Sequence, residues 1–176
     1  MEESGEKWRF FLYFSVLIEI KKVMATFIGE NYCKVDSKGR IILPMDFIKQ
    51  LPVDSRDHLI VRKDIFVNCL VLYSADDWNR QVEKIRKKIN PYNRLHSNFL
   101  RNFYKGTDKL ELDSNNRFLL PRRLLDLIGV ERDVVLLGQD GKIEIWAAGN
   151  YHSTDMTPED LANQTEEFLG DINDSD

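Results

Sequence analysis

Two arginines have the spacing and surroundings of functional side chains. The stretch DSKGRIILP begins at Asp36 and reaches Arg40 four residues later, and DSNNRFLLP begins at Asp113 and reaches Arg117 in the same way. A guanidinium group binds phosphates and the edges of guanine bases, and it also pairs with carboxylates. The spacing therefore allows two roles, contact with a nucleic acid and an ion pair that holds the local backbone, and both stay open at this point.

Both motifs predict a tight turn. An aspartate side chain accepts hydrogen bonds from backbone N–H groups about two residues further on. Gly39 then supplies the positive φ that most residues resist, and Asn116 replaces it in the second motif. Asparagine is the next most tolerant residue at positive φ. We therefore expect Asp36 and Gly39 to form one turn and Asp113 and Asn116 to form another, each leading into a strand that begins at its arginine.

The turns belong to a longer internal repeat. FIGENYCKVDSKGRIILP at 27–44 aligns without a gap with YKGTDKLELDSNNRFLLP at 104–121. A proline and the apolar pattern of a short helix follow in both copies, and we expect Pro44 and Pro121 in the first helical turn. Strand-like runs come next, at 58–62, 69–73, 134–138 and 142–146. The unit is strand, turn, strand, helix, strand, strand, and the chain contains it twice.

Five segments follow from the repeat and from composition. They are a dispensable leader at 1–23, the first repeat at 24–77, a helical linker at 78–103, the second repeat at 104–151, and an acidic tail with a short helix at 152–176. The leader contains an apolar run, but Glu19 interrupts it, and it is shorter than the about 20 residues that span a bilayer. We expect the domain to start at Met24.

Charge is unevenly distributed along the chain. The formal net charge is −4, the charges of the leader cancel, and the tail contributes eight acidic and no basic side chains, so residues 24–151 carry +4. The linker is the most basic stretch. A basic body is compatible with a nucleic-acid partner, although a charged helix is most often a solvated face.

Several kinds of chemistry have no support in the sequence. The two cysteines, Cys33 and Cys69, form no CxxC pair, so we expect neither a zinc site nor a disulfide framework. No glycine-rich phosphate loop or nucleophile motif is present. We expect no metal, no cofactor and no enzymatic activity.

From Met24 to about Trp146 the chain resembles the MraZ family, bacterial transcriptional regulators of the AbrB-like (SpoVT-AbrB) superfamily. The resemblance rests on FIGENYCKVDSKGRIILPMDF, on DSNNRFLLPRRLL, and on VVLLGQDGKIEIW. It implies an α+β fold in which two AbrB-like swapped-hairpin halves form a pseudo-twofold double-split β-barrel, with a helical linker and a C-terminal helix. A chain with both halves can form this barrel alone, which explains the repeat.

The resemblance also implies a function. Members assemble into closed rings and bind promoter direct repeats in double-stranded DNA, usually repressing their own division and cell-wall gene cluster. That implies a cytoplasmic, nucleoid-associated protein. Arg40 falls on the DNA-contacting arginine of the family's DxKGR motif, with Lys38 beside it. Arg117 matches in the second copy, where Asn115 and Asn116 depart from the pattern, so we expect it to be secondary. The alternative is a ring-forming structural or interaction protein without DNA binding.

Overall fold

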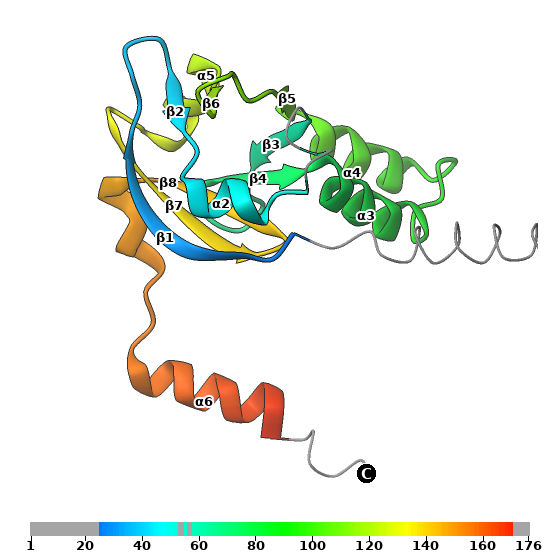
Figure 1. The fold of residues 1–176 in the computed structure, drawn as a ribbon. Coiled ribbons are helices and arrows are strands. Elements are labelled where there is room, and N and C mark those ends of the chain that lie inside the picture. The colour runs from blue at the N-terminus through cyan, green and yellow to red at the C-terminus, as the bar shows by residue number, and fades with distance from the viewer. Residues whose placement is uncertain (1–24, 53–54, 56–57, 171–176) are drawn as a thin grey trace, which may run out of the picture.

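The computed structural model describes residues 25–52, 55 and 58–170 (Figure 1). The predicted leader, 1–23, and the last six residues of the acidic tail lie outside this part. In chain order the elements are β1 (Phe27–Lys34), β2 (Arg40–Ile42), α2 (Met45–Gln50), β3 (Leu59–Lys63), β4 (Leu70–Ser74), α3 (Ala75–Arg86), α4 (Arg94–Tyr104), β5 (Asp108–Leu110), β6 (Arg117–Leu119), α5 (Arg122–Ile128), β7 (Asp133–Asp140), β8 (Lys142–Ala147), the 3₁₀ helix η2 (Ala148–Thr154) and α6 (Pro158–Leu169).

The predicted repeat unit is confirmed in both halves as an order of elements. The first half is β1-β2-α2-β3-β4, and the second is β5-β6-α5-β7-β8. Equivalent aromatic contacts join the last strand of each half to the helix that follows it. Tyr73 lies 5.9 Å from Trp78 between ring centroids, and Trp146 lies 6.2 Å from Tyr151. The fold is therefore a mixed α+β structure built on an antiparallel sheet.

The two halves exchange their first strands. The large sheet has the order β1-β7-β8-β4-β3-β5, and β2 pairs with β6 in a separate two-stranded sheet. Strand β1 pairs with β7 of the other half along all eight of its residues, and β5 pairs with β3 of the other half along three. Swapping the two halves reproduces the same strand order in reverse. Neither half alone can complete its sheet.

The small β2–β6 sheet has one face in the core and one face in solvent. Ile41 and Phe118 lie opposite each other in the centre of the two strands, and both are fully buried. Their neighbours Ile42 and Leu119 point outward and are 60% and 54% exposed. This alternation follows from the two-residue period of a strand. Truncating Phe118 to alanine would cost about 3–5 kcal/mol, as is typical of buried aromatic residues.

Pro44 and Pro121 lie one position earlier than the sequence predicted. Each is the N-cap of its helix rather than a member of the first turn, with an extended backbone at φ −54° and −55°. The Pro44 carbonyl accepts hydrogen bonds from the N–H groups of Phe47 and Ile48 at 3.0 and 3.1 Å. The extended ψ of the proline lets the chain pass directly from a strand into a helix, and this geometry places the proline just outside the helix.

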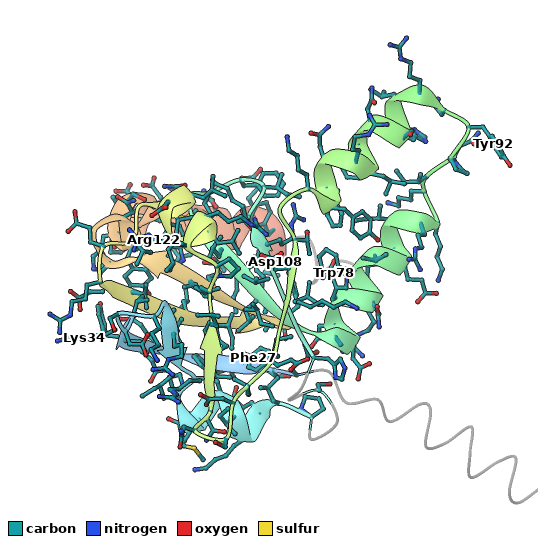
Figure 2. The ribbon with its side chains drawn as sticks, turned by 90° about the horizontal axis from the view of Figure 1, so that it is seen from above. Phe27, Lys34, Trp78, Tyr92, Asp108 and Arg122 are labelled. Atoms are coloured by element: carbon teal, nitrogen blue, oxygen red, sulfur yellow. The ribbon has the colours of Figure 1, made fainter. Side chains whose placement is uncertain are left out.

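The linker forms a helical hairpin, α3–α4, that projects from the sheet with Tyr92 at its far end (Figure 2). Its inner side is held by aromatic stacking, because Trp78 lies 5.6 Å from Phe103, and the Arg62 guanidinium lies 4.2 Å above the Phe103 ring. The apolar spacing predicted a first helix reaching Pro91, but α3 ends at Arg86. The Lys87 N–H still bonds the Glu83 carbonyl four positions back, but the N–H groups of Lys88 and Ile89 bond carbonyls only three positions back, so the chain tightens there and the helix stops.

The predicted C-terminal helix is confirmed as α6. Its N-cap is Thr157, whose hydroxyl accepts a hydrogen bond from the Asp160 N–H at 3.1 Å. Figure 1 shows α6 extending away from the sheet. Among the described residues, no helix combines the length and the apolar character needed to cross a membrane.

Gly138 is expected to be essential for the exchange of β1. A Cβ atom at this position would lie 2.7 Å from the Phe27 carbonyl carbon and 2.8 Å from the Ile28 nitrogen. Gly138→Ala should therefore push β1 off β7 and lower the free energy of unfolding by about 1–3 kcal/mol. Urea denaturation measures this. Gly149→Ala is the control, since no atom lies within 4 Å of its added Cβ. Equal stability of the two variants would contradict the prediction.

Candidate functional site

The Asp36 carboxylate organises the first turn. One of its oxygens accepts hydrogen bonds from the backbone N–H groups of Lys38 at 2.8 Å and Arg40 at 2.9 Å. The other oxygen accepts from the Arg40 Nε at 2.7 Å. Gly39 has φ 85°, as predicted from its place in the motif. One carboxylate therefore closes the turn and also fixes the direction of the arginine side chain.

The second turn repeats this geometry with a different residue at positive φ. Asp113 accepts from the backbone N–H groups of Asn115 and Arg117, both at 2.9 Å, and from the Arg117 Nε at 2.8 Å. Asn116 occupies the glycine position at φ 56°. The prediction that the turn survives the replacement of glycine is confirmed.

Each turn is bonded to the other half of the molecule. The Gly39 carbonyl accepts from the Leu120 N–H at 3.0 Å, and the Asn116 carbonyl accepts from the Leu43 N–H at 2.8 Å. In the β2–β6 pairing, Arg40 lies opposite Leu119 and Ile42 lies opposite Arg117. The four predicted turn residues and both arginines are thus brought to one surface, where Figure 1 shows β2 beside β6.

The ion pairs of the two turns shift the titration of both aspartates. The backbone N–H of Arg40, followed by its guanidinium and the backbone N–H of Lys38, lowers the pKa of Asp36 to about 2. The guanidinium of Arg117, followed by its backbone N–H, lowers the pKa of Asp113. Both carboxylates are therefore ionised at neutral pH and present fixed negative charges to their arginines.

The ion-pair role left open by the sequence is present at both arginines, although the two differ in detail. Arg40 binds Asp36 through Nε, and its two terminal nitrogens have no other partner in the part of the chain that the structure describes. Arg117 uses both Nε and a terminal nitrogen, the latter at 2.7 Å from Asp113. Both guanidinium groups are partly exposed. Arg40 consequently keeps more of its donors for an outside ligand, and DNA contact by either residue stays a prediction.

Lys38 lies at the exposed tip of the first turn, beside a hollow of about 600 Å³. Arg122 and Arg132 also line this hollow. These two arginines were not predicted from the sequence. The signal for Arg122 lay in the alignment of the repeats, because two arginines follow Pro121 where Met45 and Asp46 follow the first proline. Arg132 lies in a loop outside the motif and had no such signal.

Within residues 25–52, 55 and 58–170, no group of three or more His, Cys, Asp or Glu side chains has an arrangement that could hold a metal ion. Cys33 and Cys69 are both free thiols.

A family model and curated proteins match most of the chain. The model described as "MraZ protein, putative antitoxin-like" matches residues 26–101 and 103–171. The chain belongs to the MraZ family. The MraZ match includes both turns, the α3–α4 hairpin and α6.

Curated MraZ relatives cover most of the chain. The protein named Transcriptional regulator MraZ from Phocaeicola vulgatus is 41% identical over 147 residues, which are 84% of this chain and 96% of the relative. Proteins with the same name from Bacteroides fragilis and Bacteroides thetaiotaomicron are 38% and 37% identical, covering 83% and 87% of this chain and 92% and 98% of their own lengths.

The depressed pKa of Asp36 predicts a specific pH dependence of stability. A group whose pKa falls from 3.8 to about 2 on folding stabilises the folded state at neutral pH, and this contribution is lost as pH falls through that interval. Asp36→Asn should therefore be less stable than the wild type at pH 7, and the difference should shrink between about pH 5 and pH 2. Thermal melts across this range measure it.

Glu111→Gln is the matched control, because the Glu111 side chain is exposed and accepts no hydrogen bond within the described part of the chain. Its stability difference from the wild type should stay flat over the same pH range. A difference for Asp36→Asn that does not change with pH would show that the ionised carboxylate contributes nothing to the turn.

Proposed function

We propose that the chain is a sequence-specific DNA-binding transcriptional regulator that contacts double-stranded DNA with the outer face of the β2–β6 sheet and with the two turns beside it. The observation that carries this proposal is the position of Arg40 and Arg117 on one outer face, each oriented by its own aspartate. The relatives' name, transcriptional regulator, supports the same role.

A two-stranded ribbon suits this task. The major groove of B-DNA is about 12 Å wide and admits two antiparallel strands. The outer face of β2–β6 offers guanidinium groups for phosphates or guanine edges, and it offers Ile42 and Leu119 for apolar contact with thymine methyl groups. Lys38 stands at the tip of the first turn, where a phosphate contact would position the ribbon.

The resemblance to the MraZ family extends this proposal to the barrel, to assembly and to the target DNA. The exchanged strands and the separate β2–β6 pair support the pseudo-twofold double-split barrel. We further propose that the chain forms a ring, binds direct repeats in its own promoter, and represses the adjoining division and cell-wall genes in the cytoplasm, at the nucleoid. A ring presents the same turn many times, so weak contacts add up if the repeats share its spacing.

The second candidate function is a ring-forming structural or interaction protein without DNA binding. One observation favours it, because both arginines are already engaged by aspartates of their own turns. The second turn also carries Asn115 where the first carries Lys38. A salt-dependent gel shift with the DNA upstream of the chain's own gene separates the two candidates.

Arg40→Ala should abolish binding to that upstream DNA, and Arg117→Ala should weaken it less. The two variants are matched controls for each other, because both remove an ion pair with an aspartate four residues earlier. Their melting temperatures should therefore fall by similar small amounts while their DNA affinities differ. Lys38→Ala should lower the salt slope of log K by about 0.9 if it neutralises one phosphate.

Fluorescence anisotropy at several salt concentrations, together with thermal melts, provides these values. Unchanged affinity in Arg40→Ala would refute the assignment of that residue. A loss of affinity that follows the loss in melting temperature equally in both variants would favour an arginine that only holds its turn.

The exposed side chains of Ile42 and Leu119 predict contact with thymine methyl groups. Replacing thymine by uracil in the upstream duplex removes only methyl groups and should weaken binding by the wild type. Ile42→Ala/Leu119→Ala should bind the thymine duplex less tightly and should no longer distinguish the two duplexes. Ile65→Ala is the control, since Ile65 is similarly exposed but lies between β3 and β4, outside the β2–β6 pairing and both turns. Equal wild-type affinity for both duplexes would contradict methyl contact.

A further inference from the structure

Helix α6 is amphipathic, yet none of its side chains is buried. Every residue of Pro158–Leu169 is exposed except Gln164, which is partly covered. A lone helix of this length is marginal in water, although Thr157 caps its first turn. Figure 1 shows it standing clear of the sheet. Its stability therefore calls for a surface that covers one of its faces.

The arrangement of side chains around α6 defines that face. At 3.6 residues per turn, Leu161, Phe168 and Leu169 fall on one stripe. Carboxylates border the stripe on both sides, with Glu159 and Glu166 along one edge and Asp160 and Glu167 along the other. Helix α6 carries no Lys or Arg. A partner for α6 must offer an apolar stripe with a basic border.

An exposed face of the α3–α4 hairpin has that character. Leu95 and Phe99 are one turn apart on α4 and exposed, and Tyr92, which is also exposed, lies at the far end of the hairpin in Figure 2. Residues 75–105 contain eight basic and three acidic side chains. The exposed cations include Lys84, Arg86, Lys88, Arg94 and Arg101. The two surfaces complement each other in both apolar character and charge.

The connection between η2 and α6 is short. Only residues 155–157 lie between η2 and α6, and they span at most about 11 Å. In Figures 1 and 2 η2, coloured orange, and the α3–α4 hairpin lie at opposite ends of the sheet. Since α6 also stands clear of its own hairpin in Figure 1, we assign the hairpin that meets α6 to another molecule.

We infer that α6 of one chain docks on the exposed Leu95 and Phe99 face of the α3–α4 hairpin of a second copy, with its carboxylates against the basic border. The contact joins two different surfaces, so each chain can give α6 to one neighbour and receive α6 from another. This inference rests on the self-association proposed above and specifies its contact surfaces, and it is independent of DNA contact.

Sedimentation velocity of the full chain without DNA tests the contact. Leu161→Asp/Phe168→Asp should lower the assembly from the wild-type mass toward the monomer, and Leu95→Asp should do the same. Leu95 is 75% exposed in the first turn of α4, where an acidic residue favours the helix, so the fold should be retained. Phe66→Asp is the matched control, because Phe66 is a highly exposed apolar residue between β3 and β4.

Mixing the two variants gives the most specific result. The α6 variant keeps an intact hairpin and the Leu95 variant keeps an intact α6, so the mixture should form one contact per pair and sediment as a dimer. Wild-type mass in both variants would overturn the docking and leave the proposed ring in place. A monomeric wild type would overturn both. A mass change in the α6 variant alone would overturn the hairpin as partner, as would a mixture that stays monomeric.

Discussion

The exchange of strands between the two halves is the constraint on which the rest of the structure depends. Strand β1 completes the sheet of the second half, and β5 completes that of the first. Because the first strand of each half pairs with a strand of the other half, the connections that follow β1 and β5 must cross the molecule. These connections are the two turns, and the exchange brings them together over the buried pair Ile41 and Phe118.

Backbone hydrogen bonds between the halves fix the turns relative to each other. The carbonyl of the residue at positive φ in one turn accepts from the strand end of the other half, and the reverse also holds. This arrangement limits what can occupy Gly39, whose added Cβ would lie 3.0 Å from the Leu120 carbonyl oxygen, in addition to needing positive φ. Two arginines on one rigid surface result from backbone geometry, and the aspartates then set their directions.

The repeated motif made the local structure predictable. An aspartate four residues before an arginine, with glycine or asparagine between them, has few ways to satisfy its backbone, so both turns were predicted correctly. Apolar runs likewise predicted the strands, and the capping residue Thr157 followed by Pro158 predicted the start of α6. The positions of Pro44 and Pro121 and the end of α3 were predicted less well, because helix ends depend on individual hydrogen bonds that no periodic pattern encodes.

Long-range relations were harder to predict. The sequence around Arg132 contains no motif that would place it beside Lys38, because the hollow they share is formed by segments from both halves. The exchanged pairing itself came from resemblance to a family and not from periodicity, since either half could have paired its own strands with the same alternation. The exposed apolar face of α6 was likewise not predictable, because only the fold shows which helices pack against the sheet.

Photocrosslinking to DNA tests the central claim, that the two adjacent turns form the DNA-contacting surface. A photoreactive residue at exposed Ser37 or Ser114 should crosslink to the duplex upstream of the chain's own gene, more strongly at Ser37. The same residue at Lys87, exposed on the basic hairpin, should not crosslink. Crosslinks at Lys87 with none at either serine would contradict the account, because they would place DNA on the hairpin and leave the turns a purely structural role.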